Sequence, residues 1–264
     1  MSAAVNTKSA HDEQVETETL SLLDHLMELR KLLVRCAVAV LIGFVAAYAV
    51  VREPLMAFII EPIKARGIEI IYTAVSEAFA TQFRTSIVAG VVMVSPFLFY
   101  SMWAFIKPAL YDNEIRLFRG LFFCALVLFL AGVVFCYTCV YNLAISFFIT
   151  SGEDVATPML SLDKYVSFLF SFILPFGVAF ELPVALFIAA RMGWANYAGL
   201  AKARKYVFFG IFVVAAILTP PDVVSQVMLG LPMYLLYEIG IQVARHTKPR
   251  VSPDLEDETE DAEA

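Results

Sequence analysis

A single carboxylate stands in the middle of a long apolar segment of this sequence. Glu181 is the one charged residue between Tyr165 and Ala190, and it lies ten positions before Arg191. In a helix it would sit about 15 Å from the Arg191 end of the segment, near the centre of a bilayer. A charge there costs about 2.5 to 3.5 kcal/mol on insertion scales, so we expect the carboxyl to be protonated or to find a donor or water.

The neighbours of Glu181 suggest several uses for its carboxyl group. Gly177, Ala185 and Ala189 share its helix face, and small residues let a second helix approach closely. Pro183 lacks the N–H that would continue the helix, so a kink is expected here. The carboxyl would fix packing within the bundle, contact a partner helix, or form a proton or ion site. Ionisable residues inside membranes are functional by default, and we favour a functional role.

Two polar stretches carry further carboxylates. Residues 22–35, LLDHLMELRKLLVR, have the pattern of an amphipathic helix, in which Glu28 could pair with Lys31 or Arg35. Residues 103–119, WAFIKPALYDNEIRLFR, place Glu114 just before the next apolar run. Acids at a helix N-terminus often do no more than offset the helix dipole. Both carboxylates therefore have a structural interpretation beside a functional one.

The elements that position these residues are membrane spans. The chain is 60% hydrophobic and only 17% charged, whereas a soluble domain is about half apolar and a quarter charged. Residues 85–106 and 120–152 contain no charged side chain at all. About 20 apolar residues in a helix cross the hydrocarbon layer, and a β-barrel would alternate polar and apolar residues instead. The composition indicates a polytopic helical membrane protein.

We expect an all-α bundle of six transmembrane helices, with short C-terminal spans. The expected spans are residues 32–51, 85–106, 120–141, 165–190, 206–218 and 223–244. The fifth reaches only about 20 Å, less than the usual hydrocarbon thickness. A disordered N-terminus and a disordered acidic tail flank the membrane domain; the three parts are residues 1–19, 20–245 and 246–264.

Basic residues predict the orientation of the bundle. With the N-terminus in the cytoplasm, most of the 19 lysines and arginines fall on the cytoplasmic side. Both chain ends would then be cytoplasmic.

The sequence contains no constellation that predicts catalysis. It has no phosphate-binding G-x-x-x-x-G-K-[ST] loop, no G-x-S-x-G and no H-E-x-x-H. The histidines, His11, His25 and His246, all lie in cytoplasmic or interfacial segments. We therefore expect no enzyme activity, cofactor or metal site.

Five motifs, in order along the chain, resemble TatC, the large subunit of the twin-arginine protein translocase. They are HLMELRK (25–31), WAFIKPALYDNE (103–114), FGVAFELPV (176–184), LTPPDVVSQ (218–226) and PMYLLYEIG (232–240). The resemblance spans about residues 20–245. It implies a concave, glove-like bundle in the bacterial cytoplasmic membrane, with both ends cytoplasmic.

The resemblance also implies a binding site for signal peptides with two adjacent arginines. The matching positions are Glu28 and Arg30 in the first motif, and Phe105 and Glu114 in the second. The chemistry agrees, because a carboxylate accepts the planar guanidinium fork with two hydrogen bonds and a lysine offers only a point charge. Two arginines would use two acceptors.

Other matching positions imply contacts with partner subunits of the TatA and TatB type, which span the membrane once. Glu181 falls on the family's membrane glutamate, and Thr219 and Gln226 match a polar cluster where a partner helix docks. Pro62 and Asp222 match outer-face positions, for which we expect a structural role. Such a protein would act as an oligomer with its partners and export folded proteins with energy from the proton gradient. No nucleic-acid partner is expected.

One alternative is a proton-coupled secondary transporter of a small solute, with Glu181 as its coupling site. That class is expected to show internal repeats and a second midplane charge or broken helix. No repeat is obvious, and Glu181 is alone in its span.

Overall fold

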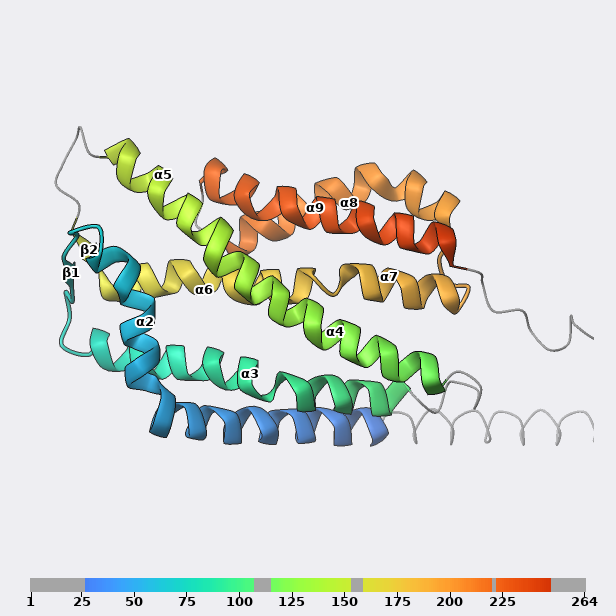
Figure 1. The fold of residues 1–264 in the computed structure, drawn as a ribbon, viewed down its shortest axis with the longest axis horizontal. Helices are drawn as coiled ribbons and strands as arrows, with labels where there is room; N and C mark the ends of the chain where they lie inside the picture. Colours follow the sequence, from blue (N-terminus) through green and yellow to red (C-terminus); the bar gives the residue numbers. More distant parts are fainter. Residues whose placement is uncertain (1–26, 107–114, 153–158, 220–221, 248–264) are drawn as a thin grey trace, which may run out of the picture.

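The computed structural model of the chain is a bundle of long helices (Figure 1). It describes residues 27–106, 115–152, 159–219 and 222–247. One end of the bundle holds two short strands, and we call it the cap end. The first helix begins and the last helix finishes at the opposite end, which we call the terminal end. The expected N-terminal segment and almost all of the expected acidic tail lie outside the described residues.

The first helix is longer than the expected span. Residues 27–46 are α-helical and continue through a π-helical turn, η1 (Ala47–Val51), into α2 (Arg52–Lys64). Pro54 lies in the first turn of α2 and has no N–H to donate to the turn before it. π-turns and prolines are common causes of a bend, and Figure 1 shows α2 leaving the line of the first helix here.

Helix α3 (Glu77–Ile106) runs beside the first helix and crosses it at two glycines. A Cβ atom on Gly43 would lie 2.7 Å from Cγ1 of Val94, and one on Gly90 would lie 2.6 Å from the backbone nitrogen of Phe44. Both distances are too short for real atoms. The close crossing therefore depends on the absence of side chains at these two positions.

The third membrane segment extends well beyond the expected residues 120–141. Helix α4 (Ile115–Phe135) passes through the π-helical segment η4 (Cys136–Tyr141) into α5 (Asn142–Gly152). Neither proline nor glycine occurs from Val133 to Ser151, so nothing in the sequence stops the helix before Gly152, the last residue of α5.

Two short strands join distant parts of the chain at the cap end. Strand β1 (Ile70–Ile71) pairs in parallel with β2 (Leu160–Ser161), with Ile70 opposite Leu160. Strand β1 leads into α3, and β2 leads into the helix that begins at Leu162. The strand pair therefore places the starts of these two helices side by side.

The expected kink near Glu181 is confirmed as a break between two helices. Helix α6 (Leu162–Ala179) ends just before Phe180, and α7 (Leu182–Arg191) begins just after Glu181. Pro183 is in the first turn of α7, where its missing N–H costs nothing. Glu181 is thus the residue immediately before α7.

The last two helices are α8 (Tyr197–Leu218) and α9 (Val223–His246). Within the described residues, five helical segments are long and apolar enough to cross a membrane: Met27–Lys64, Glu77–Phe105, Arg119–Gly152, Leu162–Arg191 and Val223–His246. Helix α8 contains the fifth expected span, residues 206–218. It is not among these five segments; its N-terminal half carries Lys202, Arg204 and Lys205, so only the remainder is apolar. The all-α polytopic class is confirmed.

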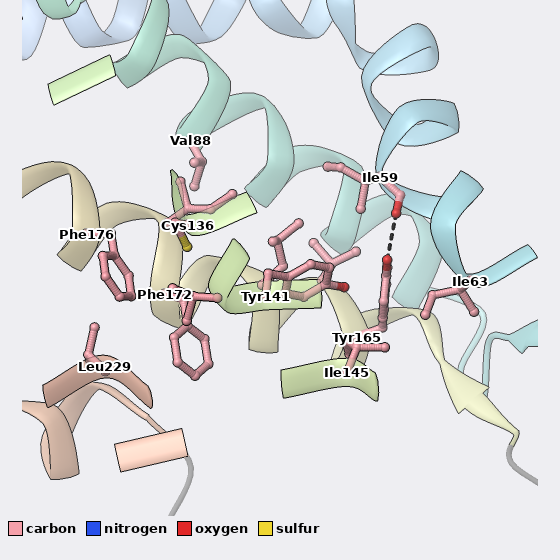
Figure 2. Close-up of a cluster of buried hydrophobic side chains, with 14 of the residues drawn as sticks. Ile59, Ile63, Val88, Cys136, Tyr141, Ile145, Tyr165, Phe172, Phe176 and Leu229 are labelled. Carbon is pink, nitrogen blue, oxygen red and sulfur yellow. Dashed lines mark hydrogen bonds between the residues drawn. The ribbon is translucent and has the colours of Figure 1, made fainter. Parts of the chain in front are cut away.

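The largest buried cluster lies toward the cap end, where α2, η4 and α6 meet (Figure 2). Tyr141, Phe172 and Phe176 are almost fully buried there. The hydroxyl of Tyr165 donates a 2.7 Å hydrogen bond to the backbone oxygen of Ile59, which ties α6 to α2. Many other large apolar side chains are exposed, as expected of a chain whose solvent is lipid.

Candidate functional site

Glu28 and Phe105 line one hollow at the terminal end, between the first helix and α3. Its volume is about 240 Å³, and its lining residues are Glu28, Lys31, Leu32, Arg35, Ser101, Ala104 and Phe105. The residues of the first helix recur every three or four positions, which places them on one face. The short side chains contributed by α3, Ser101 and Ala104, leave the space open.

The structure places the four predicted signal-peptide residues differently. Glu28 and Phe105 come together from elements far apart in the sequence. Arg30 is exposed on the first helix and does not line the hollow. Glu114 lies outside the described residues.

The hollow is lined by one acid and two bases, so it offers one carboxylate to a guanidinium and no second one. Glu28 is the acid among its lining residues, and Lys31 and Arg35 are two bases from the same helix. An incoming arginine would pair with Glu28 and stack on the ring of Phe105. A second arginine would meet the two bases, so it needs another acceptor. The predicted role of Glu114 fits this requirement.

Glu181 occupies the break between α6 and α7 with an unsatisfied oxygen. Its Oε1 atom is buried and has no hydrogen-bond partner among the described residues, whereas the residue as a whole is half-buried. A buried polar oxygen without a partner costs free energy and is rare in folded proteins. The arrangement therefore leaves an acceptor, or a protonated donor, available within the membrane segment.

The small residues around Glu181 do not form one free surface. A Cβ atom on Gly177 would lie 2.7 Å from Cε2 of Phe129, so α4 already fills this position. Ala185 is exposed and Ala189 half-buried. The expected close approach of a helix does occur at Gly177, and the approaching helix belongs to this chain.

The polar residues near the turn between α8 and α9 have partners within the chain. The hydroxyl of Thr219 donates to the Ala215 carbonyl at 2.9 Å, and Thr219 is itself buried. The amide nitrogen of Gln226 donates to the Phe212 carbonyl at 2.9 Å, which links α9 to α8. The Gln226 bond therefore helps to hold the two helices together, whereas the Thr219 bond stays within the C-terminal turn of α8.

The two expected outer-face residues lie in structural positions. Asp222 precedes α9, and its side chain accepts a 2.7 Å hydrogen bond from the backbone N–H of Ser225. This is an N-cap, which satisfies one of the free N–H groups at a helix start. Pro62 lies inside the last turns of α2, between the buried side chains of Ile59 and Ile63.

Sequence reasoning missed a second buried carboxylate, Glu77, at the start of α3. Its Oε2 accepts hydrogen bonds from the N–H and hydroxyl of Thr73 and from the N–H of Ala74, at 2.5, 2.8 and 3.2 Å. Its Oε1 accepts from the hydroxyl of Ser161 and the N–H of Asp163, at 2.6 and 2.9 Å. Glu77 thus latches the segment before α3 to the segment before α6. The local signal was a threonine shortly before an acid at a helix start.

A third carboxylate, Glu238 of α9, is paired with Arg204 of α8. Arg204 Nε lies 2.9 Å from Oε1 of Glu238, and Nη2 donates to Oε2 at 3.0 Å. The Tyr234 hydroxyl donates to Oε1 at 2.8 Å. This bidentate pair accounts for Glu238, which therefore does not supply the second midplane charge of a transporter.

Comparison with known proteins decides the family. The family model of the Sec-independent protein translocase protein (TatC) matches residues 24–232. The chain belongs to the TatC family. This TatC chain is 40% identical to the TatC protein of Magnetococcus marinus over 227 residues, which cover 85% of this chain and 83% of that protein. It is 36% identical to TatC of Escherichia coli over 235 residues, which cover 86% and 89% of the two chains.

Solved structures agree with the sequence match. A crystal structure of the twin-arginine translocase receptor TatC superposes on this chain with a TM-score of 0.78 and 35% identity, and covers 83% of this chain and 97% of the other. The family is one of translocase subunits, so the sequence-based assignment to a translocase rather than an enzyme is confirmed. The chain is accordingly a multi-pass membrane protein of a translocase complex.

No group of three or more His, Cys, Asp or Glu side chains within the described residues is arranged to hold a metal ion.

Proposed function

We propose that this core subunit of a twin-arginine translocase is the receptor for signal peptides with two adjacent arginines, and that it binds them in the hollow formed by Glu28 and Phe105. The supporting observation is that these two residues meet from the first helix and α3 in one open space at the terminal end. The carboxylate accepts the guanidinium fork of one arginine, and the aromatic ring covers its plane.

Two further residues complete the proposed receptor. Glu114 supplies the acceptor for the second arginine, because Lys31 and Arg35 already give the hollow an excess of positive charge. Arg30 stands on the exposed side of the first helix, outside the hollow, and contacts the peptide beyond its arginine pair.

Glu181 is the proposed membrane contact for a single-span partner of the TatA or TatB type. The unsatisfied Oε1 supports this role, since a polar group on a partner helix would complete its hydrogen bonding. Thr219 and Gln226 are already bonded within the chain, so we propose that they shape the docking surface: Gln226 keeps α8 and α9 in register for the partner, and Thr219 completes the last turn of α8.

The proposed setting is the bacterial cytoplasmic membrane, with the terminal end and both chain termini in the cytoplasm. The basic residues of the terminal end support this orientation. The chain would work in an oligomer with its partners, carry folded proteins and draw on the proton gradient, without a cofactor of its own.

A binding measurement tests the receptor role. The protein is reconstituted in lipid nanodiscs and titrated with a labelled twin-arginine peptide and a twin-lysine version. Loss of one charge-assisted hydrogen bond costs about 1.5 to 3 kcal/mol, so Glu28→Ala should weaken binding of the arginine peptide by roughly ten- to a hundredfold. Phe105→Ala and Glu114→Ala should weaken it as well.

The matched control is Glu69→Ala, which removes an exposed carboxylate at the cap end. It should bind the arginine peptide as the wild type does. Equal affinity of the wild type for both peptides, or equal loss in the control and in Glu28→Ala, would exclude the proposed site.

The solute-transporter alternative is supported by Glu181 and by the break between α6 and α7, which that class is expected to show. Two other observations oppose it. Glu238 is neutralised by Arg204, and the family is one of protein translocases.

A further inference from the structure

A second hollow lies at the terminal end, on a different part of the molecule from the Glu28 hollow. Its volume is about 810 Å³, and it opens between α7 and α9. The lining residues are Phe187, Arg191, Ile239, Gln242, Val243, His246 and Thr247. None of the residues that we assign to peptide or partner binding belongs to it.

On both helices, an apolar side chain is followed by a basic one toward the terminal end. On α7, Phe187 is followed one turn later by Arg191, and on α9, Val243 is followed three residues later by His246. Both helices end at the terminal end. The deeper part of the groove is therefore apolar and its mouth is basic, and the lining residues include no acid.

The depth of the groove matches the boundary between hydrocarbon and lipid headgroups. Trp194 lies three residues beyond Arg191 and is 76% exposed. Tryptophan and tyrosine gather at this boundary. Nearby, the guanidinium of Arg245 lies 5.6 Å from the centre of the Tyr197 ring, which adds a further base and a further aromatic at the same level.

The contacts of His246 leave one ring nitrogen available. Nδ1 lies 2.8 Å from the carbonyl oxygen of Gln242, and because that oxygen only accepts, Nδ1 carries the hydrogen. The other ring nitrogen, Nε2, takes no part in this hydrogen bond. It can therefore donate to an anion when the ring is protonated.

We propose that this groove binds one anionic glycerophospholipid. The phosphodiester contacts Arg191, Gln242 and His246, and one acyl chain lies along Phe187, Ile239 and Val243. Basic pockets between transmembrane helices on the cytoplasmic side bind anionic headgroups in this manner.

Two simpler explanations, a purely structural role for the bases and occupation by the chain's own acidic tail, account for only part of the groove. Arg191 and His246 stand in the last turns of their helices, where a base offsets the helix dipole, but that role gives no reason for the apolar wall below them. The stretch after position 253 matches the basic mouth in charge, but Leu255 is its one large apolar side chain, whereas Phe187, Ile239 and Val243 all line the apolar wall. A phospholipid matches both parts.

The test counts lipids retained by the full-length protein in native mass spectrometry. Detergent-purified protein is incubated with phosphatidylglycerol or with phosphatidylcholine of the same acyl chains. Each base near a membrane surface contributes about 1 kcal/mol, so we expect roughly fivefold preference for phosphatidylglycerol per base. The double variant Arg191→Gln with His246→Gln should lose the preference.

Two further variants separate this site from general charge attraction and from misfolding. Val243→Trp keeps both bases and fills the apolar wall, so retention of phosphatidylglycerol should fall. Arg119→Gln removes an exposed base from α4 at the same end and should leave retention unchanged. Unchanged Tm in all variants would show that they fold.

Several results would overturn the proposal. They are equal retention of the two lipids by the wild type, a preference that survives both groove variants, and displacement of the lipid by glycerophosphate at equal concentration, which would indicate a free-anion site. A preference that appears only after removal of residues 248–264 would show that the chain's own tail fills the groove.

Discussion

Glu77 and Glu181 are both carboxylates in mainly apolar helical segments, yet their surroundings are opposite. Glu77 accepts five hydrogen bonds from two segments of the chain. Glu181 has an oxygen that is buried without a partner among the described residues. A carboxylate that is fully bonded within the chain stabilises the fold, and one that is left incomplete is available to another molecule. The hydrogen bonds thus give Glu77 a structural role and support the proposal that Glu181 binds another molecule.

The largest effect on stability is expected for Glu77→Ala. Removing the carboxylate leaves five hydrogen-bond donors without their acceptor and detaches the start of α3 from the start of α6. Each such bond to a charged group contributes more than a neutral one, so we expect Tm in detergent to fall by roughly 5 to 10 °C. Glu69→Ala, at an exposed position on the same side, is the control and should not lower Tm. An unchanged Tm for Glu77→Ala would contradict the structural role.

A smaller loss of stability is expected for Tyr165→Phe, which removes a single hydrogen bond near the cap end. The hydroxyl donates to the Ile59 carbonyl in a buried site. Removing it leaves one buried acceptor and should cost about 1 kcal/mol. Thermal unfolding measures the difference. Tyr206→Phe, at a residue that is 81% exposed, should cost nothing, and an equal loss in both variants would show that the tyrosine hydroxyls act through something other than this bond.

Arg84→Gln should have a smaller effect still, because its bonds are exposed. Arg84 donates to Asp163 at 3.0 Å and to the Ser167 hydroxyl, and nearly half of its side chain is accessible. Exposed ion pairs contribute about 0 to 1 kcal/mol. The loss should shrink further in high salt, where such pairs are screened. A loss as large as that of Glu77→Ala, unaffected by salt, would mean that Arg84 is part of the latch.

The smallest effect on stability is expected for Glu181→Gln, and its effect on assembly tests what the partner needs from this side chain. No hydrogen bond of Oε1 within the described residues is lost, so Tm should stay within about 2 °C of the wild type. Co-purification of a single-span partner and export of a twin-arginine reporter measure the function. If the partner needs only a hydrogen bond, the amide preserves assembly, and loss of the partner shows that the acid itself is required. A fall in Tm comparable to that of Glu77→Ala would remove the distinction between the two carboxylates.

The sequence predicted the fold class well because lipid imposes a simple rule on it. Uncharged runs must be helices, and Pro183 correctly predicted the interruption near Glu181. Helix ends were predicted less well. The first helix and the continuous helical segment from α4 to α5 extend beyond the expected spans. Apolar content indicates which residues lie in the hydrocarbon layer, and it does not indicate where a helix ends.

The candidate site was predictable in part. The resemblance of motifs assigned Glu28 and Phe105 to the same function, and the structure places both in one hollow; their role in peptide binding stays a prediction. The latch at Glu77 could not be found from the sequence, because its partners Ser161 and Asp163 are brought close only by the pairing of β1 with β2. Two-residue strands carry no periodicity that a sequence pattern would reveal.

The latch at Glu77 also has a consequence for biosynthesis. Ser161 lies 84 residues after Glu77, and a ribosome that adds about 5 to 20 residues per second needs roughly 4 to 17 s to cover that distance. Until then, only the local donors from Thr73 and Ala74 are available to the carboxylate. During that interval, the first helix and α3 can already pack together at Gly43 and Gly90. The cap end is therefore completed late in synthesis. In an insertion intermediate that stalls before residue 161, Glu77 should lack its hydrogen bonds to Ser161 and Asp163.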